Sequence, residues 1–511
     1  MRFRASFLAG LLLSVLLAGG CAVNPVTGER ELSFMSTEEE IATGERHYLQ
    51  FQQASGGLYT ADPALAEYVS QVGRRVAAVS DRDLPYEFVV LNSDVANAWA
   101  LPGGKIAVTR GLLEALDNEA ELAALLGHEI VHAAARHGAQ RLQRAQLGQL
   151  ALLGVAVATR ESTYSDLIGF GSGLALQMFT QKYNRDDERE SDYYGMKYMH
   201  AAGYDSSAAV SLHEKFLALS EGRKPTWLQA LFETHPPSAE RVENNRAALA
   251  KFPSGGTLGR AAYREKTAYL RARKDAYEDA REAEDLLDSN PDAALRAIDA
   301  AIAREPREAR FHGTRGRILA RQERHREAVR AFGAAIRRDG NYYAYYLDRG
   351  LSYDWLDRRG RALRDLERSM DLLPTAEAAY ALGRIWIEDG KRQEAKSLFE
   401  TAARGGGEAG RYARKAYIGL DIADAPERYI AVEPVLSNGE VFVRVRNRTE
   451  FDFADIVVRA DATIDGQPGY RKTGRLARLG AYGTDVVSTG LYFGDRAIRV
   501  AARAVRATPA F

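Results

Sequence analysis

Residues 122–138 read LAALLGHEIVHAAARHG, and the arrangement of histidines in this stretch points to a metal-binding helix. His128 and His132 are four residues apart, so both imidazoles lie on one helix face and can reach one metal ion. Glu129 can take a proton from a water molecule at the metal and later pass it to a leaving amine. The surrounding apolar residues predict a buried helix that fixes these rotamers; they are Leu125, Leu126, Ile130 and Val131.

A tetrahedral catalytic zinc also needs a third protein ligand and one position for water. The metzincin pattern would place Gly at 135 and His at 138, and this chain has Ala135 and Gly138 instead. The better candidate is Glu188, 56 residues beyond His132. Asp192, one helical turn later, can accept a hydrogen bond from the second nitrogen of a ligand histidine.

Two neighbouring residues offer alternatives to this assignment. Glu190 is a rival third ligand, although it points to a different helix face from Asp192. His137 follows His132 by five residues, which places it off the metal-facing side of a continuous helix. We therefore predict a surface or helix-capping role for His137.

The composition limits the class of protein. The chain has 511 residues and a mass of 56.3 kDa, with 46% hydrophobic and 27% charged residues, which is typical of a globular protein of about three domains. The 69 Lys and Arg residues balance 69 Asp and Glu residues, so a polycation that binds nucleic acid is not expected. Cys21 is the only cysteine, which excludes an intrachain disulfide and a cysteine-based zinc cluster.

Residues 1–20 are predicted to be a signal peptide. Two arginines precede an apolar run at 7–18 that is too short to span a bilayer comfortably. Two glycines before Cys21 resemble a bacterial lipobox, so residues 21–35 are predicted to be a tether lipidated at Cys21. Because Ala22 follows the cysteine, the resemblance implies an outer-membrane lipoprotein that faces the periplasm. The alternative is a plain secretory signal and a soluble periplasmic protein.

Residues 36–252 are predicted to form the metalloprotease domain, which is mainly helical with a small sheet. Ser36 or Thr37 begins a capping box at a helix start, and residues 86–91 are rich in strand-forming side chains. The helical pattern that contains the two histidines runs to His137 and predicts a stop at Gly138. Residues 141–183 are largely apolar, which favours a core helix or, alternatively, a lid or membrane-surface segment.

A repeat with a 34-residue period follows the predicted protease domain. Gly316 and Gly350 are 34 residues apart, and Ile298, Phe332 and Leu366 keep the same step. Small residues would let paired helices approach, and the large ones would fill the gaps between repeats. The period predicts an α-solenoid of about four tetratricopeptide repeats over residues 270–410.

Beyond the repeats the apolar period changes to two residues, as in Val441, Val443 and Val445. Asn438-Gly439 and Asp465-Gly466 are typical of hairpin turns. Residues 428–511 are therefore predicted to form a C-terminal all-β sandwich without a catalytic site.

The sequence HExxH followed by E-x-E-(S/A)-D-x-x-G resembles the zinc metalloendopeptidases of the CaaX-prenyl-protease and heat-shock membrane protease type. The exported branch with tetratricopeptide repeats is the most similar, on NPVTG at 24–28 and NAWALPGG at 97–104. Ser191 departs from the family, which usually has Ala there. The β domain is not part of the usual family pattern.

The resemblance implies a zincin-type domain that binds one Zn²⁺ per chain, with three protein ligands and a general base. The ligands would be His128, His132 and Glu188, and the general base would be Glu129. It also implies that an edge strand pairs with an extended substrate, whereas the alternative is an ordinary sheet strand. The residues of this strand are Lys105, Ile106, Ala107, Val108 and Thr109.

Two further positions match the family. His235, in Thr234-His235-Pro236, would stabilise the oxyanion or cover the zinc as a fourth ligand, and the alternative is a plain loop histidine. Arg241 follows at the family's spacing and would orient the carboxylates.

The expected function is that of a zinc metalloendopeptidase that cleaves misfolded or stalled envelope proteins, with repeats that bind a client or the outer-membrane assembly machinery. The rival hypothesis is a chaperone-like assembly scaffold whose protease domain is latent or inactive.

Residues 304–368 contain 17 Arg against 10 Asp and Glu. This excess could face an acidic partner or anionic lipid, or belong to a solvated helix surface.

Overall fold

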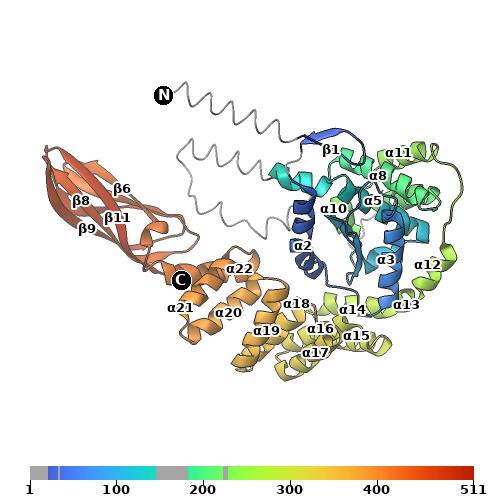
Figure 1. Cartoon of the computed structure of the whole chain (residues 1–511). Helices are drawn as coiled ribbons and strands as arrows, with labels where there is room; N and C mark the ends of the chain where they lie inside the picture. The colour runs from blue at the N-terminus through green and yellow to red at the C-terminus, as the bar shows by residue number, and fades with distance from the viewer. Residues whose placement is uncertain (1–20, 33–34, 146–181, 222–227) are drawn as a thin grey trace. The chain divides into compact units, whose positions relative to one another are not determined.

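The computed structural model describes residues 21–32, 35–145, 182–221 and 228–511 (Figure 1). The chain divides into two compact units, Met1–Leu373 and Pro374–Phe511. The predicted signal peptide and most of the apolar stretch at 141–183 lie outside the described residues. Within the described ranges, no helix combines the length and the apolar character needed to cross a membrane.

The first unit begins with an antiparallel strand pair and two helices: β1 (Cys21–Val23), β2 (Arg30–Leu32), α2 (Thr37–Ala54) and α3 (Pro63–Ala77). The predicted capping box is present at the start of α2. The Ser36 hydroxyl accepts from the Glu39 N–H, and the Glu39 carboxylate accepts from the Ser36 N–H. Two backbone donors that helix geometry leaves unpaired are thereby satisfied.

A three-stranded sheet follows, composed of β3 (Glu87–Leu91), β4 (Ala98–Leu101) and β5 (Lys105–Thr109). The strand order is β3-β5-β4, with β5 parallel to β3 and antiparallel to β4. The prediction that Lys105–Thr109 is an edge strand is therefore wrong, because β5 is central and all five of its residues are buried. The turn at Gly103 and Gly104, both with positive φ, folds β4 back onto β5 and covers that side.

Several of the described helices lie in the part of the first unit around the two histidines. They are α4 (Arg110–Ala115), α5 (Glu119–Ala134), α8 (Arg185–Ala201), α9 (Ser207–Glu221), α10 (Gln229–Thr234) and α11 (Ala239–Leu249). Asn118 caps α5 by accepting from the Glu121 N–H at 2.9 Å. The predicted stop at Gly138 is wrong, because α5 ends at Ala134 and Arg136 adopts a left-handed conformation with φ 66°. Residues 137–145 are helical again.

Two glycines let α5 and α8 approach closely. A Cβ atom on Gly127 would lie 2.9 Å from the Gly195 carbonyl oxygen, and one on Gly195 would lie 2.9 Å from the backbone nitrogen of His128. Larger residues would therefore separate the helices. The glycine of the D-x-x-G pattern thus has a packing role, since it brings Glu188 and Asp192 against the turn that carries the histidines.

Eight further helices complete the described part of the first unit. They are α12 (Arg260–Lys266), α13 (Ala268–Arg271), α14 (Lys274–Leu286), α15 (Pro291–Arg304), α16 (Ala309–Arg321), α17 (His325–Arg338), α18 (Tyr343–Trp355) and α19 (Arg359–Leu372). The helices from α14 to α19 pack as consecutive pairs. A Cβ on Gly316 would lie 2.4 Å from the Phe332 ring, and one on Gly350 would lie 2.9 Å from Leu366. Within each helix pair, the large side chain of the second helix thus fills the space next to the glycine of the first helix.

The repeat helices of the first unit are hydrogen-bonded to the domain that carries the histidines. The Asn92 amide donates to Glu308 at 2.8 Å, and Arg310 donates to the Asn92 carbonyl at 2.8 Å. The Gln53 side chain donates to the Asn341 carbonyl and accepts from the Tyr343 N–H. These buried and partly buried hydrogen bonds join the two parts over several elements.

The second unit contains three helices, a short 3₁₀ turn (Pro426–Arg428) and six strands. They are α20 (Ala376–Glu388), α21 (Arg392–Ala403), α22 (Gly407–Asp421), β6 (Ile430–Ser437), β7 (Glu440–Asn447), β8 (Phe453–Ile464), β9 (Gln467–Leu479), β10 (Thr484–Tyr492) and β11 (Ile498–Pro509). The strands form two antiparallel sheets, β10-β7-β6 and β11-β8-β9, with one shared apolar core. Both predicted hairpin turns, at Asn438-Gly439 and Asp465-Gly466, are confirmed, since all four residues have positive φ.

Candidate metal centre

Four buried side chains bring metal-binding atoms together, all within 4.8 Å of one another: His128, His132, Glu188 and His235. The first two come from α5, Glu188 from α8, and His235 from the end of α10. The Nε2 atoms of His128 and His132 are 3.0 Å apart. His132 Nε2 lies 3.4 Å from Glu188 Oε1, and His128 Nε2 lies 3.3 Å from His235 Nδ1.

The donor set fits a zinc ion. His128 Nδ1 lies 2.9 Å from Asp192 Oδ1, so this nitrogen carries the proton and Nε2 presents a lone pair to the cluster. Burial lowers the pKa of His132 well below its usual value, which favours the neutral imidazole that a metal ligand must have. Two such lone pairs next to a carboxylate repel one another unless a cation lies among them. Two imidazoles and a carboxylate are also a common ligand set for catalytic zinc.

Arg241 contacts two acidic side chains of α8, Glu188 and Asp192. Its Nη1 atom lies 2.7 Å from Glu188 Oε2, and its Nη2 and Nε atoms donate to the two oxygens of Asp192 at 2.7 and 2.8 Å. Burial alone would raise the pKa of Glu188, but the charges of His235 and Arg241 hold that pKa well below its usual range. The positive charges of His235 and Arg241 therefore keep Glu188 ionised. The geometry agrees with the predicted orienting role for Arg241.

Glu129 lies beside the cluster with both carboxylate oxygens free of hydrogen bonds to the described residues. The residue is 1% exposed, and His235 Nε2 lies 3.6 Å from its Oε1 atom. Burial raises the pKa of Glu129 above its usual value. A buried carboxylate with unpartnered oxygens and a raised pKa has the properties of a general base.

His235 is buried and caps the end of α10. Its Nδ1 atom lies 2.9 Å from Glu188 Oε1 and 3.3 Å from His128 Nε2, so the ring contacts two other members of the cluster. The position is compatible with both roles predicted for His235, as a fourth ligand and as an oxyanion donor.

Tyr183 was not singled out by the sequence. Its ring stacks on His132 with centroids 3.8 Å apart, and the centroid of His235 lies 5.3 Å away. Burial raises the pKa of Tyr183 to about 12, so the phenol is neutral near pH 7. No local pattern marks an aromatic residue in a loop as a neighbour of a site formed elsewhere in the chain.

His137 differs from the prediction, whereas Glu190 lies outside the cluster, as the preference for Glu188 expects. The prediction of a surface role for His137 is wrong, since the side chain is 3% exposed and its Nδ1 atom lies 2.9 Å from His132 Nδ1. Glu190, the rival ligand, lies outside the four-residue cluster. Its carboxylate accepts from Asn24 at 2.9 Å and lies 3.6 Å from His137 Nε2.

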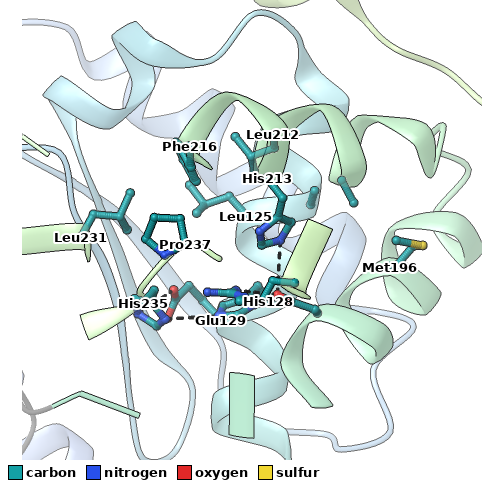
Figure 2. Close-up of a pocket in the computed structure, with 14 residues that line it drawn as sticks. Leu125, His128, Glu129, Met196, Leu212, His213, Phe216, Leu231, His235 and Pro237 are labelled. Carbon is teal, nitrogen blue, oxygen red and sulfur yellow. Dashed lines mark hydrogen bonds and ion pairs between the residues drawn. The ribbon is translucent and has the colours of Figure 1, made fainter. Parts of the chain in front are cut away.

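An apolar pocket opens beside His128 and Glu129 (Figure 2). His213, on α9, also lines it and lies 3.3 Å from Asp192 Oδ1. The apolar lining residues include Ala124, Leu125, Met196, Ala209, Leu212, Phe216, Leu231 and Pro237. A substrate side chain next to the reacting bond would meet this surface.

Asp192→Ala is expected to weaken zinc binding by about 10–100-fold, because the change removes the acceptor that fixes the tautomer and orientation of His128. Competition with a metal chelator would measure the affinity. Asp186→Ala, an exposed position on the same helix, serves as the matched control and should bind zinc like the wild type. Equal affinities for all three proteins would contradict the assigned role of Asp192.

Two histidines and a glutamate on one helix, with a carboxylate from a second helix, are the side-chain arrangement found in metallopeptidases of the HExxH type. Residues 63–248 match the model of Peptidase family M48, so this part of the chain is similar to the metallopeptidases of that family.

Two curated relatives illustrate the similarity. The beta-barrel assembly-enhancing protease of Yersinia pestis is 27% identical over 257 residues, covering 47% of this chain and 52% of that protein. The mitochondrial metalloendopeptidase OMA1 of Schizosaccharomyces pombe is 32% identical over 221 residues, covering 43% of this chain and 63% of that protein. The chain thus spans about half the length of the first of these relatives.

Among solved structures, MamA from Desulfovibrio magneticus RS-1 matches 30% of this chain and 88% of its own, with 17% identity and a TM-score of 0.27.

Proposed function

We propose that the chain is a zinc-dependent metalloendopeptidase that cleaves misfolded or stalled envelope proteins in the periplasm. The observation that carries the proposal is the convergence of His128, His132 and Glu188 next to Glu129, whose oxygens have no hydrogen-bond partner in the described residues. Relatives named as a β-barrel assembly-enhancing protease and a metalloendopeptidase support both the reaction and an envelope client.

His128, His132 and Glu188 would hold the zinc ion, and His235 lies where it can add a fourth donor at rest. When bound, zinc supplies a Lewis acid that polarises the scissile carbonyl and lowers the pKa of water. Asp192 and Arg241 hold the ligand side chains in place, since Asp192 contacts His128 and Arg241 contacts Glu188. The ligands are therefore positioned before substrate binds.

Glu129 would move the proton of the reaction. Its free carboxylate accepts a proton from the attacking water, and the new C–O bond forms at the peptide carbon. The same proton is then donated to the leaving nitrogen as the C–N bond breaks, which gives a carboxylic acid and an amine. The acid proton then passes to the amine, so the products are a carboxylate and an ammonium group. The pKa raised by burial helps the Glu129 carboxylate to hold the transferred proton between the two steps. His235 Nε2, close to Glu129, can instead donate to the developing oxyanion.

The substrate would lie extended across the site with an apolar side chain in the neighbouring pocket. Leu125, Leu212 and Phe216 line that pocket together with His128 and Glu129. Unfolded proteins expose apolar side chains that folded proteins bury, so the pocket favours such clients. Of the described strands of this sheet, β4 is an edge that packs against α5, and we propose it in place of β5 as the strand that pairs with substrate.

The repeats would bind a client or a partner at the outer membrane, such as the assembly machinery for membrane proteins. The N-terminal ends of α16 and α18 are hydrogen-bonded to the protease domain, at Glu308 with Asn92 and at Tyr343 with Gln53. A client held by the repeats would therefore be kept at a defined distance from the site.

Cys21→Ser tests the proposed lipid anchor. A serine at this position cannot carry a thioether-linked diacylglycerol, so the variant should remain uncleaved or become soluble. Membrane fractionation and mass spectrometry of the N-terminal peptide would detect the change. Outer-membrane localisation of the Cys21→Ser variant without an acyl chain would show that the lipid is not the anchor.

Incubation of the full-length, zinc-loaded chain with an unfolded protein such as casein tests the proposed function. We expect internal cleavage, with products whose new termini are identified by mass spectrometry. The rival hypothesis, a chaperone-like scaffold with a latent or inactive protease domain, predicts that the chain suppresses aggregation without producing fragments. Suppression without cleavage at saturating zinc would therefore favour the rival.

A further inference from the structure

We propose that His137 is a positioning residue for the metal ligand His132, and that it acts by accepting the Nδ1 proton of that ligand. The inference rests on the proposed function of the cluster as a zinc site. His137 Nδ1 lies 2.9 Å from His132 Nδ1, and both side chains are buried, at 3% and 1% exposure. At this distance one nitrogen must donate and the other must accept.

The direction of this hydrogen bond follows from the cluster. His132 presents Nε2 toward His128 and Glu188, so Nε2 must carry the lone pair when a metal is bound. A neutral imidazole then has its proton on Nδ1 and donates it to His137. His137 consequently accepts with Nδ1 and carries its own proton on Nε2.

The groups that face the other side of His137 favour the same tautomer. Its Nε2 atom lies 3.6 Å from Glu190 Oε1 and 3.9 Å from Asp187 Oδ1, both on α8. Two acidic side chains on this side stabilise an N–H group and disfavour a lone pair. Asn24 donates to Glu190 at 2.9 Å, so the contacts run from the N-terminal segment through Glu190 and His137 to His132.

The backbone explains how a residue five positions after a ligand reaches that ligand. On a continuous helix, position 137 would be rotated by about 140° from position 132. The left-handed Arg136 ends the helix and turns His137 back toward the cluster. Arg136 is itself held by Glu40 and by the Met35 carbonyl, and Arg82 also contacts Glu40 at 2.8 Å. The break is thus supported by the Glu40 side chain of α2 and by the backbone carbonyl of Met35.

The acceptor for His132 differs in charge from the acceptor for His128. His128 donates to the carboxylate of Asp192, which Arg241 neutralises. His132 donates to a neutral imidazole, so its orientation is fixed without a further carboxylate in direct contact with it. The two ligand histidines, which look equivalent in the HExxH motif, therefore donate to different acceptors, a carboxylate for His128 and an imidazole for His132.

Zinc affinity of the full-length chain, measured by chelator competition, tests the proposal. His137→Ala should weaken binding by about 10–100-fold, as the loss of an outer hydrogen-bond partner does. His137→Asn places an amide oxygen near the position of Nδ1 and should recover most of this loss. The control is His200→Ala, which removes a histidine of α8 that lies outside the cluster, and this variant should leave the affinity unchanged. Equal losses in the Ala and Asn variants would indicate a packing role and overturn the proposal.

A second measurement does not depend on how the variants fold. In the zinc-loaded wild type labelled with ¹⁵N-histidine, NMR should show a protonated Nδ1 on His132 and a protonated Nε2 on His137. A protonated Nδ1 on His137 would overturn the proposal even if zinc binds normally. Failure of the wild type to bind zinc would instead defeat the proposed function, so the two failures are distinguishable.

Discussion

Glu129→Gln is expected to lower kcat for peptide hydrolysis by at least about 10²–10⁴-fold, the contribution typical of acid–base catalysis. The amide has nearly the shape of the carboxylate but cannot accept a proton near neutral pH. Since Glu129 makes no hydrogen bond to the described residues, the substitution breaks no such contact. Fold and zinc content should therefore stay at wild-type values. Steady-state kinetics on a short unfolded peptide, with zinc measured on the same samples, would show this separation.

The matched control for this experiment is Glu233→Gln, an exposed glutamate on α10 near His235. It introduces the same chemical change without touching the cluster and should retain full activity. A Glu129→Gln variant with wild-type kcat would eliminate Glu129 as the base. Full rescue of envelope stress by Glu129→Gln, together with no cleavage by the wild type, would support the scaffold hypothesis.

Glu188→Ala is expected to remove stoichiometric zinc and with it all metal-dependent cleavage. The change deletes the only carboxylate in the cluster and leaves the positive charge of Arg241 facing the two histidines. The loss of affinity should exceed the roughly 10–100-fold effect of losing a residue that only orients a ligand. Metal analysis after dialysis against a weak chelator would measure the occupancy.

Glu190→Ala provides the comparison for that variant, because it removes a carboxylate from the same helix. Glu190 lies outside the four-residue cluster and contacts Asn24 and His137, so its loss should leave most of the zinc bound. Retention of zinc by Glu188→Ala and loss of zinc by Glu190→Ala would reverse the ligand assignment.

Local sequence signals predicted the elements whose structure is determined by nearby residues. The capping box at Ser36 and the hairpin turns at Asn438-Gly439 and Asp465-Gly466 require particular residues at fixed spacing, and these residues are visible in the sequence. The 34-residue step likewise placed Gly316 opposite Phe332, since a small residue must face a large one where paired helices meet.

Features that depend on tertiary packing were not predictable in the same way. The alternation of residues 105–109 identifies a strand but not its neighbours, and β5 is in the centre of its sheet. His137 was placed on the wrong face because the left-handed Arg136 is held by Glu40 and Met35, about 100 residues earlier in the chain. The hydrogen bonds between Asn92 and the repeat helices have no signal in either segment alone.

We propose that a zinc ion held by His128, His132 and Glu188 makes this chain a peptidase. The most direct test of this proposal is a titration of the metal-free, full-length wild type with Zn²⁺, with cleavage of an internally quenched peptide recorded at each step. We expect no cleavage without metal and a rate that rises until one zinc ion is bound per chain. A metal-free chain that cleaves at the full rate, or a zinc-saturated chain that does not cleave, would contradict the proposal.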